Sequence, residues 1–156
     1  MCGACCGKQK KFKKECLEEH NRLREMHDCP PLKLDAKLSK YARNWAKSLS
    51  KGDNLQYRIP KLHGENIYYT RYKNVPGTEP VRFWYNEIVN YDYGIQKFQC
   101  GTQGFTQVLW KNSCLLGIGI AKKKEQIWVV CNYSPTGNIP GQYAANVPTR
   151  SCDDDD

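Results

Sequence analysis

Three cysteines at the amino terminus are the residues with the most evident chemistry. The chain opens MCGACCGKQKKFKK, in which Cys2, Cys5 and Cys6 precede five lysines within residues 8–14. Cysteine thiols beside a polybasic segment are typical substrates for reversible S-palmitoylation. One acyl chain binds a bilayer only marginally, so stable attachment needs several chains or additional basic residues. We therefore predict that residues 1–11 form a lipidated, polybasic anchor that binds membrane lipids.

Other interpretations of this segment are a secretion signal, a zinc site and a disordered tail with incidental thiols. A signal peptide needs about 7–15 apolar residues after a basic start, whereas here the lysines follow a short first stretch. A zinc site is disfavoured because Cys5 and Cys6 are adjacent and no Cys-x-x-Cys pair follows them. The disordered tail stays open. No window holds about 18 consecutive apolar residues, so we expect a protein that is not secreted and does not span a membrane.

Length and composition fit one folded domain. The chain has 156 residues, of which 40% are hydrophobic, and a net charge of +8. That charge is compatible with nucleic-acid binding. However, many lysines are scattered as on solvated helix faces, and we find no basic stripe with interleaved stacking aromatics. We predict a globular domain over residues 12–150, a short acidic tail over 151–156, and no nucleic-acid partner.

Six further cysteines lie outside the amino-terminal cluster. A total of nine would indicate a disulfide framework in a secreted protein, but disulfides are rare in the cytosol. Cys131, in the apolar run 128–131, is expected to be a small buried residue. A bridge between Cys100 and Cys114, which flank residues 105–110, is the first exception to consider. We predict free thiols at Cys16, Cys29, Cys100, Cys114, Cys131 and Cys152.

The hydrophobic periodicity predicts helices first and antiparallel strands later. Helices are expected over residues 12–27, 36–49, 79–90 and 105–111, and strands over 65–72, 115–121 and 126–133. Asp35 is the expected N-cap of the second helix. That helix carries a stripe predicted to be buried, formed by Leu38, Tyr41, Ala42, Trp45, Ala46 and Leu49. Residues 122–125 would join the last two strands as a hairpin. This order of elements indicates an α+β fold.

Four short motifs follow one another along the chain. They are His20-Asn21-x-x-Arg24-x-x-His27, Gly64-Glu65-Asn66-Ile67, FTQVLWKNS over residues 105–113 and CNYSPTGNI over residues 131–139. Together they resemble the CAP superfamily of cysteine-rich secretory, antigen 5 and pathogenesis-related proteins. The resemblance implies a three-layer α-β-α sandwich with a central antiparallel sheet. It is strongest to the Golgi-associated plant pathogenesis-related branch, which implies an intracellular protein held on the cytoplasmic face of the Golgi or the plasma membrane.

The resemblance also implies a cleft in which two histidines and two glutamates can hold a divalent metal. Matched by motif, Glu65 and Glu87 are the two carboxylates, whereas Tyr57 and Gly104 stand at the histidine positions. We therefore expect no catalytic residues and no tight zinc site. A weak divalent cation at the two carboxylates is the remaining option, because carboxylates favour hard cations. His63 is a candidate surrogate ligand, and Gly104 is expected to leave room for a ligand group.

Three functions stay open from the sequence. The first, which the resemblance implies, is a non-enzymatic, membrane-tethered protein that binds a lipid, a sterol or a phosphoinositide. The second is a protein-interaction or scaffold module on a membrane surface, with a homodimer formed through the cleft. The third is a degenerate metal-dependent hydrolase, which would lack the histidines needed to activate water. His20 is assigned a structural role, either bonding the backbone or packing near Trp45, rather than a chemical one.

Overall fold

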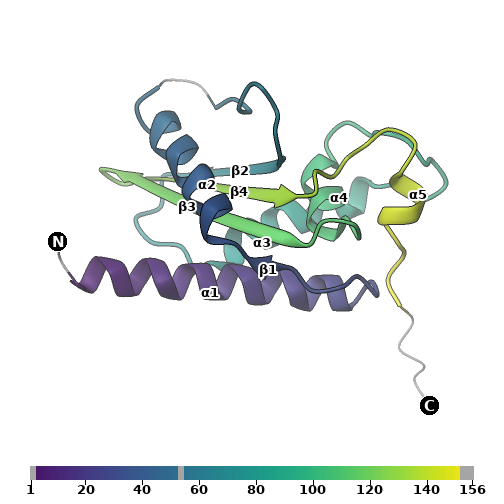
Figure 1. Cartoon of the computed structure of the whole chain (residues 1–156), viewed down its shortest axis with the longest axis horizontal. Coiled ribbons are helices and arrows are strands. Elements are labelled where there is room, and N and C mark those ends of the chain that lie inside the picture. The colour runs from purple at the N-terminus through teal and green to yellow at the C-terminus, as the bar shows by residue number, and fades with distance from the viewer. Residues whose placement is uncertain (1–2, 53–54, 152–156) are drawn as a thin grey trace, which may run out of the picture.

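A computed structural model describes residues 3–52 and 55–151 of the chain, with side chains from Cys5 onward. Four strands form one sheet in the order β1-β3-β4-β2. Helix α2 covers one face of this sheet, and α1, α3 and α4 lie on the other face (Figure 1). The expected three-layer arrangement is therefore confirmed. Cys2, Cys152 and the rest of the acidic tail lie outside the described residues.

The long strands of the sheet are antiparallel, as expected. They are β2 (Gly64–Thr70), β3 (Leu115–Lys123) and β4 (Gln126–Ser134). The hairpin between β3 and β4 turns at Lys124, whose positive φ of 56° is typical of a tight turn. The sheet is not entirely antiparallel, because the edge strand β1 (Lys33–Leu34) pairs in parallel with β3. A strand of two residues leaves no readable alternation in the sequence, so it was not predicted.

Helix α2 (Ala36–Leu49) begins as expected, because the Asp35 side chain accepts a hydrogen bond from the backbone N–H of Leu38 at 2.7 Å. The helix packs directly on β3. A Cβ atom at Gly117 or Gly119 would collide with the backbone of α2, so these glycines allow the close approach. The predicted buried stripe is confirmed at Leu38, Ala42, Ala46 and Leu49, whereas Tyr41 and Trp45 at its edge are only half-buried.

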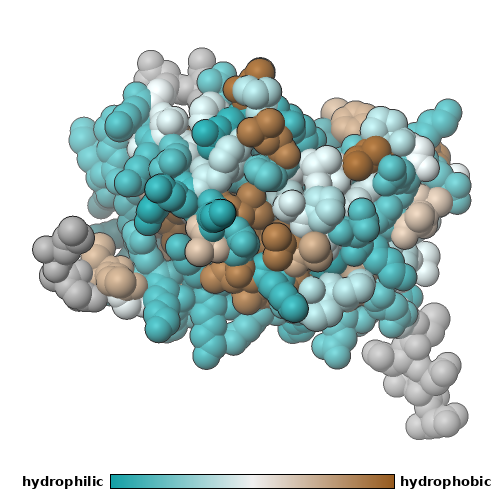
Figure 2. Space-filling view, in the orientation of Figure 1, coloured by the Kyte–Doolittle hydropathy of each residue, from teal (hydrophilic) through white to brown (hydrophobic). Residues whose placement is uncertain are grey.

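Helix α1 (Gly3–Glu25) is longer than predicted and runs along one side of the molecule (Figure 1). The prediction that the helix begins at Phe12 is wrong, because residues 3–11 continue the same helix. An ion pair at i,i+4 spacing joins the added turns to the rest of the helix, from Lys11 to Glu15 at 3.7 Å. The outward side of α1 is hydrophilic, as the teal side chains along the lower edge of Figure 2 show.

The remaining helices are short and irregular. The helix predicted over 79–90 divides into α3 (Thr78–Tyr85) and a 3-10 helix, η1 (Asn86–Asn90). Helix α4 (Gln103–Leu109) begins two residues before its predicted start, and α5 (Tyr143–Asn146) was not predicted. In the part of the chain that the structure describes, no helix has the length and apolar character needed to cross a bilayer.

Cysteine placement agrees with the sequence prediction for the described residues. Cys131 is fully buried, as expected for a small apolar residue in β4. Cys100 and Cys114 are exposed free thiols and do not form a bridge with each other. The described cysteines are all free thiols, at Cys5, Cys6, Cys16, Cys29, Cys100, Cys114 and Cys131.

Candidate functional site

The four positions matched to the family cleft come together in the fold. Glu65 is the second residue of β2, Glu87 lies in η1, and Gly104 lies in the first turn of α4. Tyr57 comes from the loop before β2. Partial burial raises the pKa of its phenol, and the nearby carboxylates of Glu87 and Glu65 raise it further. The fold therefore brings together four residues that come from separate elements.

The space beside Gly104 is not free. A Cβ atom built there would collide with Oε1 of Glu87 and would lie 3.1 Å from Cβ and Cδ1 of Trp84. The same Oε1 accepts a hydrogen bond from the backbone N–H of Phe105 at 2.8 Å. The expectation that Gly104 leaves room for a ligand group is thus wrong, because the Glu87 carboxylate occupies that room.

Each carboxylate of the cleft has its own hydrogen-bond donors. Glu65 is buried and accepts from the backbone N–H of Arg58 at 2.9 Å and from Nδ2 of Asn132 at 3.3 Å. Burial raises the pKa of the half-buried Glu87, and the backbone N–H groups of Phe105 and Gly104 oppose that rise. The pKa of Glu87 is therefore raised by burial and not by repulsion from a neighbouring carboxylate.

The donor set of the cleft does not fit zinc. His63 lies just before β2, and its ring packs edge-on against Tyr41 with the centroids 5.0 Å apart. Across residues 3–52 and 55–151, no group of three or more His, Cys, Asp or Glu side chains is placed to hold a metal ion. Zinc sites in proteins are built mainly from imidazole and thiolate ligands, whereas the cleft offers two hydrogen-bonded carboxylates and a phenol.

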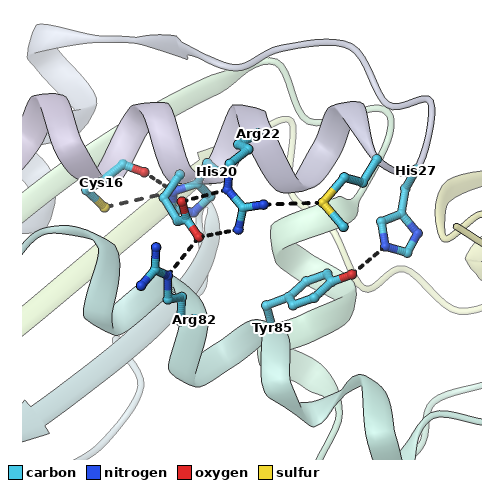
Figure 3. Close-up of polar contacts among 8 residues, drawn as sticks. Cys16, His20, Arg22, His27, Arg82 and Tyr85 are labelled. Atoms are coloured by element: carbon cyan, nitrogen blue, oxygen red, sulfur yellow. Dashed lines mark hydrogen bonds and ion pairs between the residues drawn. The ribbon is translucent and has the colours of Figure 1, made fainter. Parts of the chain in front are cut away.

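The other two histidines of the chain hold α1 in place. Figure 3 shows His20 beside Cys16 on α1 and the hydrogen bond between His27 and Tyr85 of α3. Nδ1–H of His20 donates to the carbonyl of Cys16 at 2.8 Å, and Nε2 accepts from the hydroxyl of Tyr133 at 2.8 Å. His27 is bonded in the same way to Pro148 and Tyr85.

The structural role of His20 is confirmed. Of the two options for that role, the backbone bond is present at the Cys16 carbonyl, whereas packing near Trp45 is wrong. The His20 ring lies 6.4 Å from the ring of Trp84, and Trp45 lies on the opposite face of the sheet. No histidine of this chain therefore enters the cleft.

A cavity of about 420 Å³ opens beside Glu65. It is lined by Tyr57, Arg58, Ile59, Lys61, Glu65, Phe98, Gln103 and Asn138. Its exposed lining includes two apolar side chains, Ile59 at 90% exposure and Phe98 at 57% exposure, beside Tyr57 and Lys61. The Arg58 guanidinium is engaged away from the carboxylates, 3.7 Å from the ring centroid of Tyr41. The cavity has the size of a small-molecule site, which is about 300–1,000 Å³. Sequence reasoning missed the contribution of Phe98, which belongs to a loop without periodicity.

Two buried side chains join the motifs to one another. Arg24 of the first motif is fully buried and donates to carbonyls at both ends of the segment Val108–Ser113. Gln107 of the third motif accepts from the backbone N–H of Gly137 at 3.0 Å and donates to Ser113 Oγ at 3.2 Å. Arg24 and Gln107 therefore have a structural role: their hydrogen bonds position the segments around the cleft, and they do not take part in chemistry themselves.

Comparisons with known proteins agree with this architecture. The model of the cysteine-rich secretory protein family (CAP) matches residues 17–133. Human Golgi-associated plant pathogenesis-related protein 1 is 34% identical over 134 residues, which cover 83% of this chain and 86% of that protein. Secreted protein RBT4 of Candida albicans is 33% identical over 141 residues, which cover 86% of this chain and 37% of that protein.

The fold itself is similar to solved structures. The crystal structure of NaASP2 with Zn2+ superposes with a TM-score of 0.71 at 21% identity, covering 90% of this chain and 86% of that one. At this identity the likeness concerns the fold alone. With the family model covering most of the chain and the human relative aligned over most of both lengths, this protein belongs to the CAP, or cysteine-rich secretory protein, family.

Proposed function

We propose that this chain is a non-enzymatic CAP protein, tethered to the cytoplasmic face of the Golgi or the plasma membrane, that binds a lipid in its cleft. The observation that carries the proposal is a cavity of about 420 Å³ that combines the exposed apolar side chains of Ile59 and Phe98 with the Glu65 carboxylate and has no histidine among its described lining residues. Such a site can bind an amphiphilic molecule, and it lacks the histidine ligands with which a metal-dependent hydrolase would activate water.

The polarity of the cavity favours a sterol over a phosphoinositide. The floor carries the carboxylate of Glu65, which can accept a hydrogen bond from a sterol hydroxyl, while Ile59 and Phe98 at the rim would contact an apolar ring system. An anionic headgroup would be repelled by Glu65, and Arg58 is already stacked on Tyr41. Lys61 would be the single unengaged cation among the lining residues.

The absence of a catalytic assembly in the cleft supports a binding role. Glu65 and Glu87 are both held by donors of the protein itself, at Arg58 and Phe105. A general base must be within hydrogen-bond reach of the group from which it takes a proton. The lining side chains include no serine, cysteine or histidine that a carboxylate could activate.

The tether is proposed from the first turns of α1. Cys5 and Cys6 are exposed there, next to the lysines of residues 8–14, and Cys2 lies outside the described residues. Multiple acyl chains together with basic residues satisfy the two-signal requirement for stable membrane attachment. The name of the human relative places that protein at the Golgi, and the Candida relative is named as secreted. Our proposal follows the first.

Flotation with vesicles tests the ligand. Full-length protein carrying Cys2→Ser, Cys5→Ser and Cys6→Ser should float with sterol-containing vesicles more than with phosphoinositide-containing or plain ones. I59E should abolish the difference, while V89E, at an equally exposed position outside the cavity, should not. Equal flotation with all vesicles would contradict the lipid proposal. A concentration-dependent dimer broken by I59E alone would favour the scaffold alternative instead.

The tether is tested in cells. The triple serine variant at Cys2, Cys5 and Cys6 should move from the membrane fraction to the cytosol, and hydroxylamine should release the unaltered protein by cleaving thioesters. Membrane attachment that resists both treatments would contradict acylation.

A further inference from the structure

A second cavity, of about 380 Å³, lies beside the first turns of α1, where this helix covers the end of the β3–β4 hairpin. It shares no lining residue with the cavity beside Glu65. Its apolar lining comes from Phe12 of α1, Val75 and Pro76 of the loop before α3, Ile120 of β3 and Ile127 of β4. This volume falls within the range of small-molecule sites, which is about 300–1,000 Å³. We call it the α1 groove.

The α1 groove exists because α1 begins at Gly3. Residues 5, 8 and 12 are spaced i, i+3 and i+7, so Cys5, Lys8 and Phe12 share one face of the helix, and all three line the groove. Had the chain been a flexible tail up to Phe12, the outer wall would be missing. Cys6 is exposed and is not among the lining residues.

The charges around the α1 groove place its mouth at a water boundary. Lys8, Lys11 and Lys122 line it together with a single acidic residue, Glu15. That carboxylate is already engaged, since it lies 3.7 Å from Nζ of Lys11 and accepts from the backbone N–H of Gly77 at 2.8 Å. Lysine stems can cover apolar surface while their ammonium groups stay in water. The groove therefore suits a hydrocarbon chain that enters from the solvent edge.

We propose that the α1 groove holds the hydrocarbon chain of an acyl group attached to Cys5, so that the protein can shelter one lipid anchor away from the membrane. The proposal rests on the acylation proposed above. In that step the Cys5 thiolate attacks the carbonyl carbon of a long-chain acyl thioester. The carbon–sulfur bond to the carrier breaks, and the carrier thiol leaves with the proton.

The position of Cys5 favours an acyl chain attached to this residue over a free lipid as the occupant of the α1 groove. The Cys5 side chain is part of the groove wall, so a chain bonded to it enters the apolar lining without diffusing from solution. A short tether raises the effective concentration of its ligand to the millimolar range. A chain on Cys6 would start outside the lining and is left for the bilayer. Cys5 and Cys6 thus have different roles although they are adjacent.

The test attaches a chain chemically and uses no membrane. Two variants of the full-length protein are compared, one that keeps Cys5 and one that keeps Cys6. In both variants the other cysteine of this pair and Cys2, Cys100, Cys114 and Cys152 are replaced by serine. Each is treated with hexadecyl or methyl methanethiosulfonate, in which the thiolate attacks sulfur, a disulfide forms and methanesulfinate leaves. Thermal midpoint and sedimentation are then measured.

With hexadecyl on Cys5, we expect a monomer whose thermal midpoint rises by about 3 °C or more over the methyl form, because the chain binds the folded state only. Hexadecyl on Cys6 should give no rise and should cause self-association. V75E should remove the rise at Cys5, and V89E should not.

The same thermal midpoint shift and the same sedimentation for hexadecyl on Cys5 and on Cys6 would overturn the proposal. This comparison alters no core residue, so it does not depend on whether V75E folds. The result is independent of acylation in cells. Loss of the hydroxylamine-sensitive tether would contradict the proposed function, while a failed Cys5–Cys6 difference would contradict the groove alone.

Discussion

Replacing Arg24 with methionine should destabilise the fold strongly, because this side chain is fully buried and is bonded to carbonyls far away in the sequence. Nε donates to Pro30 O at 2.8 Å, and Nη1 donates to Val108 O at 3.0 Å and Trp110 O at 2.9 Å. Nη2 donates to Ser113 O at 3.0 Å. Methionine keeps much of the volume but donates no hydrogen bond.

The expected loss follows from the carbonyls left behind. Trp110 O keeps a backbone bond from the N–H of Ser113 at 3.1 Å, but Pro30, Val108 and Ser113 would each lose the guanidinium donor. Pro30 is exposed, so water can replace the lost donor there. The bonds to Val108 and Ser113 are buried, and an orphaned buried acceptor costs about 1–3 kcal/mol. Relief from burying a charged group offsets part of this cost. We therefore expect R24M to lower the free energy of unfolding by about 3–5 kcal/mol. For a chain of this length that lowers the thermal midpoint by on the order of 10 °C.

Urea unfolding followed by tryptophan fluorescence measures this loss, with calorimetry for the midpoint. R24K keeps the charge but has fewer donors and a different geometry, so it should lie between the parent and R24M. R43M makes the same chemical change at an exposed position of α2 and should change stability by less than about 0.5 kcal/mol. If R24M lost no more than R43M, the assignment of Arg24 as a structural tie between the motifs would be refuted.

Three further predictions concern the cleft and the thiols. Because burial raises the pKa of Glu87, the folded state binds more protons than the unfolded chain above a pH of about 4.3. The contribution of this group to stability therefore falls as pH rises through the folded pKa, and E87Q should flatten the stability profile between acidic and neutral pH in urea titrations. Calorimetry should detect no stoichiometric zinc binding by the parent with its amino-terminal thiols blocked. The variant Y57H/G104H should gain zinc binding and displace Glu87, whereas sub-micromolar binding by the parent would contradict the donor-set argument. In native, non-reduced protein, Cys100 and Cys114 should both react with a thiol reagent, and protection of the pair would indicate a bridge and an oxidising compartment.

Local patterns explain why much of the fold could be predicted. The N-cap at Asp35 and the stripe of α2 depend on residues three or four apart, and the β3–β4 hairpin depends on two β-prone runs around a short turn. Glu65 and Glu87 could be named because each lies in a short motif. The same reasoning failed at the start of α1, because the polar, lysine-rich turns before Phe12 carry no apolar stripe by themselves.

By itself, the sequence determined the family and the order of the main helices and of the three long strands, because each of these is recorded in residue types and short spacings. Only the tertiary structure decided that the Glu87 carboxylate occupies the space beside Gly104 and that Cys5 lines an apolar groove. Both facts depend on which side chains approach from distant parts of the chain. Periodicity reports which face of an element is buried, but the partner of that face is set by packing across the whole domain.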